Sequence, residues 1–198
     1  MTPLPGTDPR ADSRPRRSAV RRRPGRSPLR QRQLIPRPVA EVFPFFESAR
    51  NLEDITPSWL GFHIVDAPQG RLAAGDHLEY RLRLFGIPVR WKTKILRLDP
   101  DRGFVDEQVE GPYGSWIHTH RFEPSGDGAT LMEDRVDYRL PFGALGRLAG
   151  FAVALQLHVI FSHRFRRVAE LYPPRSRTTD RPLEYPAPSP PEKGDRTR

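Results

Sequence analysis

The 198-residue sequence contains no cysteine. This absence excludes a disulfide framework, a thiolate metal site and a cysteine nucleophile. The sequence also lacks the G-x-S-x-G turn of serine hydrolases, the phosphate-cradling P-loop and the glycine fingerprint of dinucleotide-binding folds. No cofactor is therefore predicted, and any reaction would have to use other side chains.

Long uninterrupted apolar runs are also missing. Residues 144–171 come closest to a membrane span, but Arg147, Gln156 and His158 interrupt them, so we expect a core helix. No apolar segment follows the arginines at 21–23, which argues against a secretory or twin-arginine signal. We expect a cytoplasmic location, with peripheral membrane contact as a variant of it.

The formal net charge of +9 is concentrated at the N-terminus. Residues 1–30 hold nine arginines and two aspartates, which contribute about +7, and the residues after 172 add about +2. The middle of the chain is close to neutral, which is poor evidence for a fold that binds phosphates. Contact with nucleic acid or an anionic membrane is left as an alternative for the basic N-terminal tail alone.

Both ends of the chain are rich in proline, serine and arginine and poor in large apolar residues. Such segments cannot bury enough surface to offset the entropy of ordering, so we predict disordered tails over residues 1–28 and 173–198. Residues 29–172 then form one domain, because a chain of this length with 36% hydrophobic residues supports a single sizeable core.

The predicted domain begins with a strand and two short helices. The strand covers residues 30–35 and is closed by Pro36, after which Pro38 opens a helix with apolar residues at helical spacing. A second short helix covers residues 49–55 and stops before Pro57.

Alternating apolar and polar residues then predict a run of antiparallel strands, each with one buried face. These strands cover residues 60–65, 77–85, 89–95, 103–109, 116–122 and 132–140. The pattern changes after the last strand to one long apolar-rich helix over residues 144–171, in which Leu155 and Val159 recur near helical spacing. Arg164 falls near the C-terminal end of this helix, where positive charge suits the helix dipole.

The strand over residues 116–122 carries the most informative row of side chains. Trp116, His118, His120 and Phe122 alternate with the residues between them, so they share one face of the sheet. Two histidines between two bulky aromatics on an inner face indicate a lined pocket rather than a plain hydrocarbon core.

This order of elements and several local motifs resemble the SRPBCC superfamily, which includes START lipid-transfer domains and polyketide cyclase or dehydrase relatives. The chain looks most like bacterial ligand-binding SRPBCC domain or cyclase-like proteins, over about residues 29–172. The residues that carry the resemblance are LEDITPSWL at 52–60, Gly86, Ile87 and Pro88 with Trp91, FVDEQVEGPYGSW at 104–116 with His118 and His120, Asp134, Val136 and Tyr138, then Pro141, Gly143 and Gly146.

The resemblance implies an α+β helix-grip fold, in which a curved antiparallel sheet of about seven strands wraps around the long C-terminal helix, with two short helices after the first strand. It also implies a cavity between sheet and helix. We expect this cavity to bind or transfer a small hydrophobic or amphipathic ligand that is lipid-, quinone-, polyketide- or isoprenoid-like, without an obligate protein partner. The predicted ligand-binding residues, all on inward strand faces, are Tyr80, Trp91, Trp116, His118, His120, Phe122, Asp134 and Tyr138.

The histidine pair leaves several alternatives open. The imidazoles orient a ligand, hold a metal with Asp134, or pair with Asp134, Asp106 or Gln108 in a structural network. No metal is predicted, because the same wall offers no third imidazole. A cyclase or dehydratase would use His118 or His120 with Asp134 as an acid-base pair. Nothing in the spacing requires that reaction, so no catalytic residue is assigned and a binding module is preferred to an enzyme.

Overall fold

The computed structural model describes residues 27–126, 128–141 and 143–174. The two predicted disordered tails fall almost entirely on residues 1–26 and 175–198, which lie outside the described residues. The elements of the described part run from Ser27 to Leu171.

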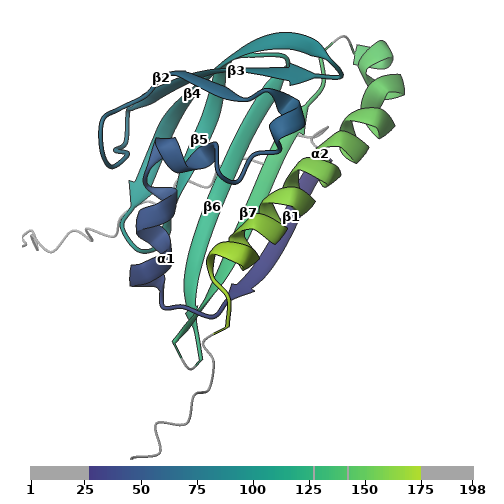
Figure 1. Cartoon of the computed structure of the whole chain (residues 1–198). Helices are drawn as coiled ribbons and strands as arrows, with labels where there is room; N and C mark the ends of the chain where they lie inside the picture. The colour runs from purple at the N-terminus through teal and green to yellow at the C-terminus, as the bar shows by residue number, and fades with distance from the viewer. Residues whose placement is uncertain (1–26, 127, 142, 175–198) are drawn as a thin grey trace, which may run out of the picture.

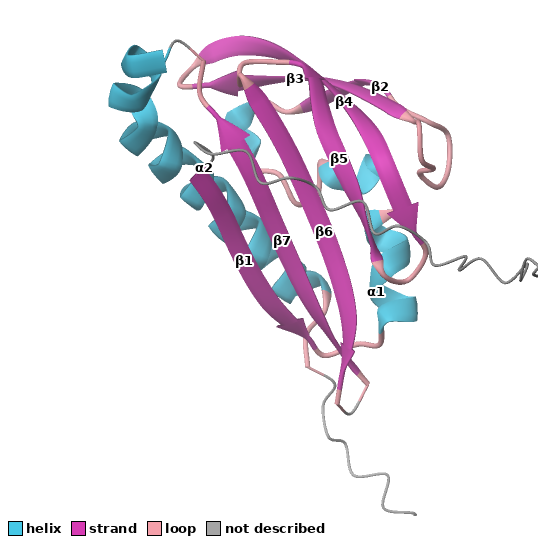
Figure 2. Cartoon of the chain, turned by 180° about the vertical axis from the view of Figure 1, so that it is seen from behind, coloured by secondary structure: helices cyan, strands magenta, loops and turns pink. Residues whose placement is uncertain are grey.

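One curved sheet of seven antiparallel strands dominates the fold (Figure 2). Its order is β1-β7-β6-β5-β4-β3-β2, so consecutive strands from β2 to β7 are neighbours and β1 lies at the edge beside β7. This confirms the antiparallel sheet that the alternating residues predict. The strands are β1 (Ser27–Ile35), β2 (His63–Asp66), β3 (His77–Leu84), β4 (Ile87–Asp99), β5 (Gly103–Glu110), β6 (Ser115–Ser125) and β7 (Ala129–Arg139).

The helices of the described residues all lie on the concave face of this sheet (Figures 1 and 2). They are α1 (Val39–Phe46), two short 3₁₀ turns, η1 (Ala49–Leu52) and η2 (Ser58–Leu60), and the long α2 (Gly143–Leu171). In Figure 1, α2 crosses in front of β7 and β1, while α1 covers the other side of the concave face. The arrangement is the predicted helix-grip fold.

The segment between α1 and β2 differs from the expectation in detail. The predicted helix over residues 49–55 is only the four-residue turn η1. The strand expected from residue 60 begins at His63, because η2 occupies residues 58–60 and ends at Gly61 in the left-handed region, with φ +53°. Glycine adopts this conformation without the steric cost that a side chain brings, so the chain turns there before the strand starts.

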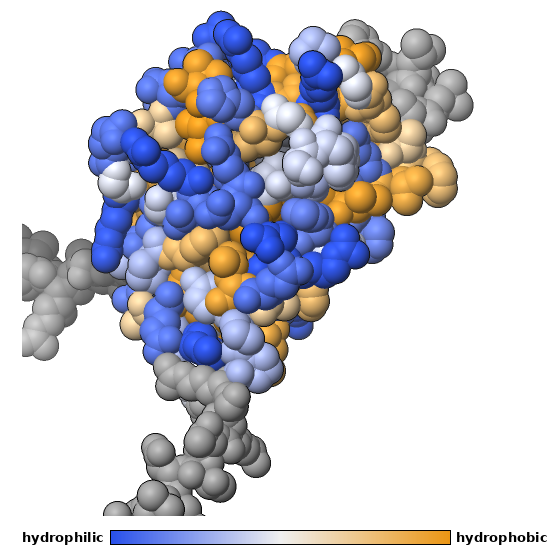
Figure 3. All heavy atoms as spheres, viewed as in Figure 1, coloured by the Kyte–Doolittle hydropathy of each residue, from blue (hydrophilic) through white to orange (hydrophobic). Residues whose placement is uncertain are grey.

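The buried face of α2 is not the one that its spacing predicts. Leu157 and Phe161 are buried, whereas Leu155 and Val159 are 54% and 42% exposed. Apolar residues occur on several sides of this helix, so periodicity alone does not identify the inner face, and apolar surface lies along the outer side of α2 (Figure 3). Among the described residues, no helix combines the length and apolar character needed to cross a bilayer.

The core consists of two apolar clusters that meet along β6. One cluster contains Phe122 together with residues of α1 and Val168 of α2, and the other contains Trp116 together with Leu157 and Phe161 of α2. Since Trp116 and Phe122 stand at the two ends of one inward-facing row, the positions between them lie where the clusters meet. His118 and His120 occupy those positions.

A substitution at Phe122 tests whether the packing of α1 against the sheet stabilises the domain. Its side chain is 1% exposed and contacts the rings of Phe43 and Phe46 at centroid distances of 5.2 and 5.0 Å. We expect Phe122→Ala to lower the free energy of unfolding by about 3–5 kcal/mol, because it leaves a cavity among aromatic rings. Phe151→Ala is the matched control, since Phe151 is 81% exposed, and should change it by no more than about 0.5 kcal/mol. Urea unfolding of both variants measures the difference, and equal effects would contradict this assignment of the core.

Candidate functional site

A cavity of about 180 Å³ lies between the inner faces of β3 to β6, the α1–β2 segment and α2. At about 10–15 Å³ for each water-sized group, it has room for roughly a dozen such groups. Apolar and aromatic side chains form most of its wall. Asp106, His118 and His120 lie together on the wall and form its polar side. The other polar residues of the lining include Thr93, Arg164, Ser48, Asn51 and Thr56.

The strand register builds the polar side of the cavity. His118 and His120 both point inward from β6 because they stand two residues apart on one strand. On β5, Asp106 is directly opposite His118, and on β7, Asp134 is directly opposite His120. The two imidazoles are therefore flanked by one carboxylate from each neighbouring strand, and all four side chains are buried.

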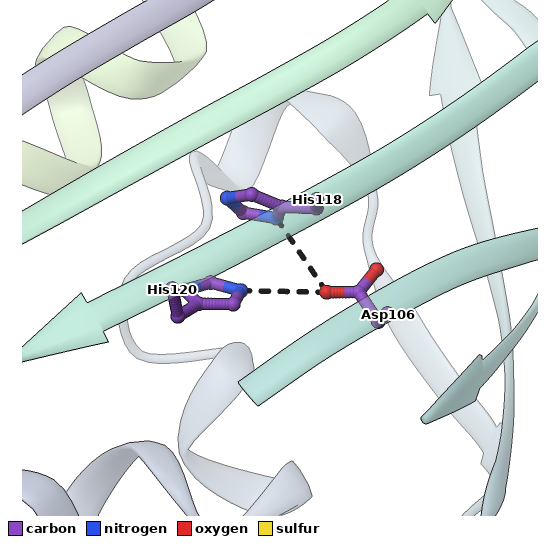
Figure 4. Close-up of side chains that lie close together, drawn as sticks. All are labelled: Asp106, His118 and His120. Atoms are coloured by element: carbon purple, nitrogen blue, oxygen red, sulfur yellow. Dashed lines mark ion pairs between the residues drawn. The ribbon is translucent and has the colours of Figure 1, made fainter. Parts of the chain in front are cut away.

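Each carboxylate faces both imidazoles. Oδ2 of Asp106 lies 3.7 Å from Nδ1 of His118 and 3.4 Å from Nε2 of His120, as Figure 4 shows. Oδ1 of Asp134 lies 3.4 Å from Nε2 of His118 and 2.8 Å from Nδ1 of His120. The imidazole ring centroids are 3.8 Å apart. Asp106, His118 and His120 each bring one donor atom within 4.8 Å of the others, a spacing that can hold a metal ion.

Arg164 reaches this cluster from α2. Its Nε lies 4.0 Å from Oδ2 of Asp134, and its guanidinium lies 6.0 Å from the centre of the Phe46 ring. Burial raises the pKa of the Asp134 carboxyl, but the positive charges of Arg164 and His120 outweigh burial and hold this pKa well below its usual value. Asp134 is thus an anion inside the protein.

The pKa values of the two histidines are shifted in opposite directions. Burial lowers the pKa of His118, and the neighbouring His120 lowers it further. Burial also lowers the pKa of His120, but the charge of Asp134 and the contacts with Asp106 and Asp134 outweigh burial, so this pKa is raised. Two imidazoles this close share their protons, and the pair holds its first proton mainly on His120.

The rest of the cavity wall next to the histidines is aromatic. The rings of Tyr80 and Trp91 stack at a centroid distance of 6.0 Å, and Trp116 packs edge-on against Trp91 at 5.1 Å. The hydroxyl of Tyr80 shares a hydrogen bond of 2.8 Å with the hydroxyl of Thr93. Burial raises the pKa of the Tyr80 hydroxyl, which keeps this ring uncharged.

The structure brings together five of the eight residues that the sequence predicts for the site. Tyr80, Trp91, Trp116, His118 and His120 line the cavity, and whether they contact a ligand stays a prediction.

The other three predicted residues do not line this cavity, and whether they contact a ligand stays a prediction. Phe122 is covered by α1, and Tyr138 is covered by the ring of Tyr113 at a centroid distance of 5.7 Å. Asp134 lies behind the histidines, beside a smaller cavity of about 10 Å³. All three face inward as predicted, but other elements fill the space in front of them.

Most residues that line the cavity are not predicted from the sequence, and Asp106, Arg164 and Tyr113 are three of them. The sequence suggests Asp106 only as a structural partner of the histidines, although it stands two residues after the inward-facing Phe104 on β5 and shares its face. Arg164 was assigned to the helix dipole, yet it stands three residues after the buried Phe161 and lies on the same side of α2. Tyr113 lies in the turn between β5 and β6, where no periodic signal exists.

The sequence model of the family described as "Polyketide cyclase / dehydrase and lipid transport" matches residues 35–158. The match includes α1, all strands from β2 to β7 and the first half of α2. No curated protein matches the chain significantly.

Several solved structures share the fold. The Zhui aromatase/cyclase from Streptomyces sp. R1128 superposes with a TM-score of 0.61 at 14% identity, over 74% of this chain and 93% of the other. A START superfamily protein from Mycobacterium smegmatis gives 0.55 at 13% identity, over 74% and 99%. The protein TTHA0849 from Thermus thermophilus gives 0.54 at 22% identity, over 73% and 99%. At these identities the likeness concerns the fold alone.

The two imidazoles of the histidine pair should titrate in two separate steps. By NMR of the ring protons, we expect the pKa of His120 to lie above the usual value of about 6.5 and that of His118 to lie below it. Asp134→Asn should lower the pKa of His120, because it removes the charge that raises it. Two imidazoles that titrate together near the usual value, in both proteins, would contradict this reading.

The same variant checks the sign of the carboxylate's contribution to stability. Since the pKa of Asp134 is lowered in the folded protein, the unfolded chain takes up this proton at a higher pH. The stabilising contribution is therefore complete above pH about 4 and is lost as the pH falls further. The difference in unfolding free energy between wild type and Asp134→Asn should shrink over that acidic range.

Proposed function

Because the chain belongs to the polyketide cyclase/dehydrase and lipid transport family, within the SRPBCC superfamily, we propose that it binds a small hydrophobic or amphipathic molecule in the cavity between the sheet and α2. Lipid-, quinone-, polyketide- and isoprenoid-like compounds are the classes that suit such a cavity. The observation that carries the proposal is the cavity itself, which has a largely apolar wall and one polar side.

The distribution of side chains favours an amphipathic ligand with one polar end. Most of the wall is hydrocarbon or aromatic, so apolar ligand surface buried there leaves water at a gain of about 25 cal/mol for each Å². The imidazoles of His118 and His120 offer hydrogen-bonding groups on the polar side. A carbonyl or hydroxyl at one end of the ligand would face these rings, while the rest would contact Trp91 and the leucines of β3.

A cavity-filling substitution tests the proposal. Leu82 lines the cavity, so Leu82→Trp should occupy ligand space and weaken binding at least tenfold, while the protein stays folded. Leu96→Trp is the matched control, because Leu96 is 44% exposed and does not line the cavity. Isothermal titration with a panel of fatty acids, quinones and aromatic polyketides, run in the presence of a chelator, measures both variants. Equal affinities, or a panel in which nothing binds wild type, would contradict the proposal.

Acid-base catalysis is a second candidate function, favoured by the opposite pKa shifts of the two histidines. In a dehydration of a β-hydroxy carbonyl compound, neutral His118 would take the proton from the carbon next to the carbonyl. Protonated His120, held by Asp134, would give its proton to the departing hydroxyl, which leaves as water. The proton count balances, because one histidine gains the proton that the other loses.

His118→Gln and His120→Gln test the catalytic alternative in chelator-treated protein. If the pair transfers protons, each variant should lose turnover of the substrate about 10²–10⁴-fold when measured at a temperature at which the variant is folded. His63→Gln is the control, since His63 is 77% exposed on β2 and should keep full activity. Turnover that survives both substitutions would exclude this role for the histidines.

A further inference from the structure

We propose that Asp106, His118 and His120 form a site for a divalent transition metal of the Zn²⁺ type on the wall of the cavity. The inference goes beyond ligand binding and stands on the geometry of these three side chains. It gives the imidazoles a role different from proton transfer, because a ring nitrogen bound to a metal is no longer free to take up a proton.

The distances between the donor atoms fit a tetrahedral metal. Bonds of about 2.0–2.1 Å to nitrogen and oxygen place neighbouring ligand atoms about 3.3–3.4 Å apart. Oδ2 of Asp106 already lies 3.4 Å from Nε2 of His120 and 3.7 Å from Nδ1 of His118. Figure 4 shows both ring nitrogens directed at this one oxygen. All three donor atoms lie within 4.8 Å of one another, a spacing from which they could close around one ion.

The imidazoles lack the hydrogen bonds that buried polar groups normally have. His118 and His120 are 6% and 4% exposed. Among the described residues neither ring has a hydrogen bond of good geometry, and Nε2 of His118 and Nδ1 of His120 are buried without such a partner. These two nitrogens face Asp134, whereas a metal ion on the Asp106 side would bind the other two, Nδ1 of His118 and Nε2 of His120.

The carboxylate of Asp134 faces both rings from the opposite side. Its Oδ1 lies 3.4 Å from Nε2 of His118 and 2.8 Å from Nδ1 of His120, the nitrogens that do not face Asp106. Histidines that bind metals almost always direct their second ring nitrogen to a carboxylate, a carbonyl or water, which fixes the ring orientation. Arg164, with its Nε 4.0 Å from Asp134, anchors that carboxylate from α2.

The site would leave one coordination position open to the cavity. All three donors line the cavity wall, so a fourth ligand would approach from the space in which a small molecule is held. Three protein ligands with one open position are the arrangement of catalytic rather than structural zinc sites. Two imidazoles and one carboxylate suit Zn²⁺, Co²⁺ or Fe²⁺ better than Mg²⁺ or Ca²⁺, which prefer oxygen ligands. The open position suits a carbonyl or carboxylate oxygen.

Metal titration of the full chain tests the site directly. After treatment with a chelator and its removal, we expect wild type to bind one Zn²⁺ per chain by isothermal titration. Bound Co²⁺ should show the strong visible absorption of four- or five-coordinate sites. Asp106→Asn and His120→Gln should weaken Zn²⁺ binding at least 100-fold, and Asp134→Asn should weaken it about 10–100-fold. His63→Gln should bind as wild type does, since His63 is exposed on β2.

Two outcomes would overturn the site. One is the absence of saturable binding to wild type, a result that does not depend on how any variant folds. The other is one-to-one binding that survives Asp106→Asn and His120→Gln. Because the ligand panel for the proposed function is measured with a chelator present, failure of the metal site and failure of ligand binding can be told apart.

Discussion

The antiparallel register of β5, β6 and β7 is the constraint on which the site depends. It sets Asp106 opposite His118 and Asp134 opposite His120, so two carboxylates enclose two imidazoles whose centres are 3.8 Å apart. A slip of one residue between β5 and β6 would turn these side chains to the other face of the sheet. The position of the polar cluster is therefore a consequence of strand pairing, which the backbone hydrogen bonds of three neighbouring strands maintain.

The pairing of opposite charges explains why the ionisable side chains of this cluster can be buried. His118 and His120 stand between Trp116 and Phe122, which belong to two different apolar clusters. Buried charges are stabilised only when they are paired, and here Arg164 from α2 balances one carboxylate and a proton or a cation on the histidine pair balances the other. The long helix thus closes the cavity and also supplies part of the electrostatic balance of its polar side.

Much of this arrangement could be predicted from the sequence, because alternation along a strand identifies the face of each side chain. The inward row on β6 and the inward positions of Tyr80 and Trp91 follow from it. The set of residues that line the cavity does not follow from alternation, because it depends on which inward residues the helices cover. Phe122 lies under α1, and Arg164 enters the site because α2 is rotated away from the face that Leu155 and Val159 suggest. Alternation along β5 predicts that Asp106 faces inward, but only the pairing of β5 with β6 shows that it lies beside His118.

The central claim is that the cavity holds an amphipathic molecule with its polar end at the histidines. A crystal structure of the chain with the tightest-binding member of the ligand panel tests this most directly. The account predicts a ligand that packs against Trp91 and Trp116, with an oxygen within hydrogen-bonding or metal-binding distance of the His118 and His120 pair. A ligand bound on the outer face of the sheet or of α2, with the cavity filled only by water, would contradict it.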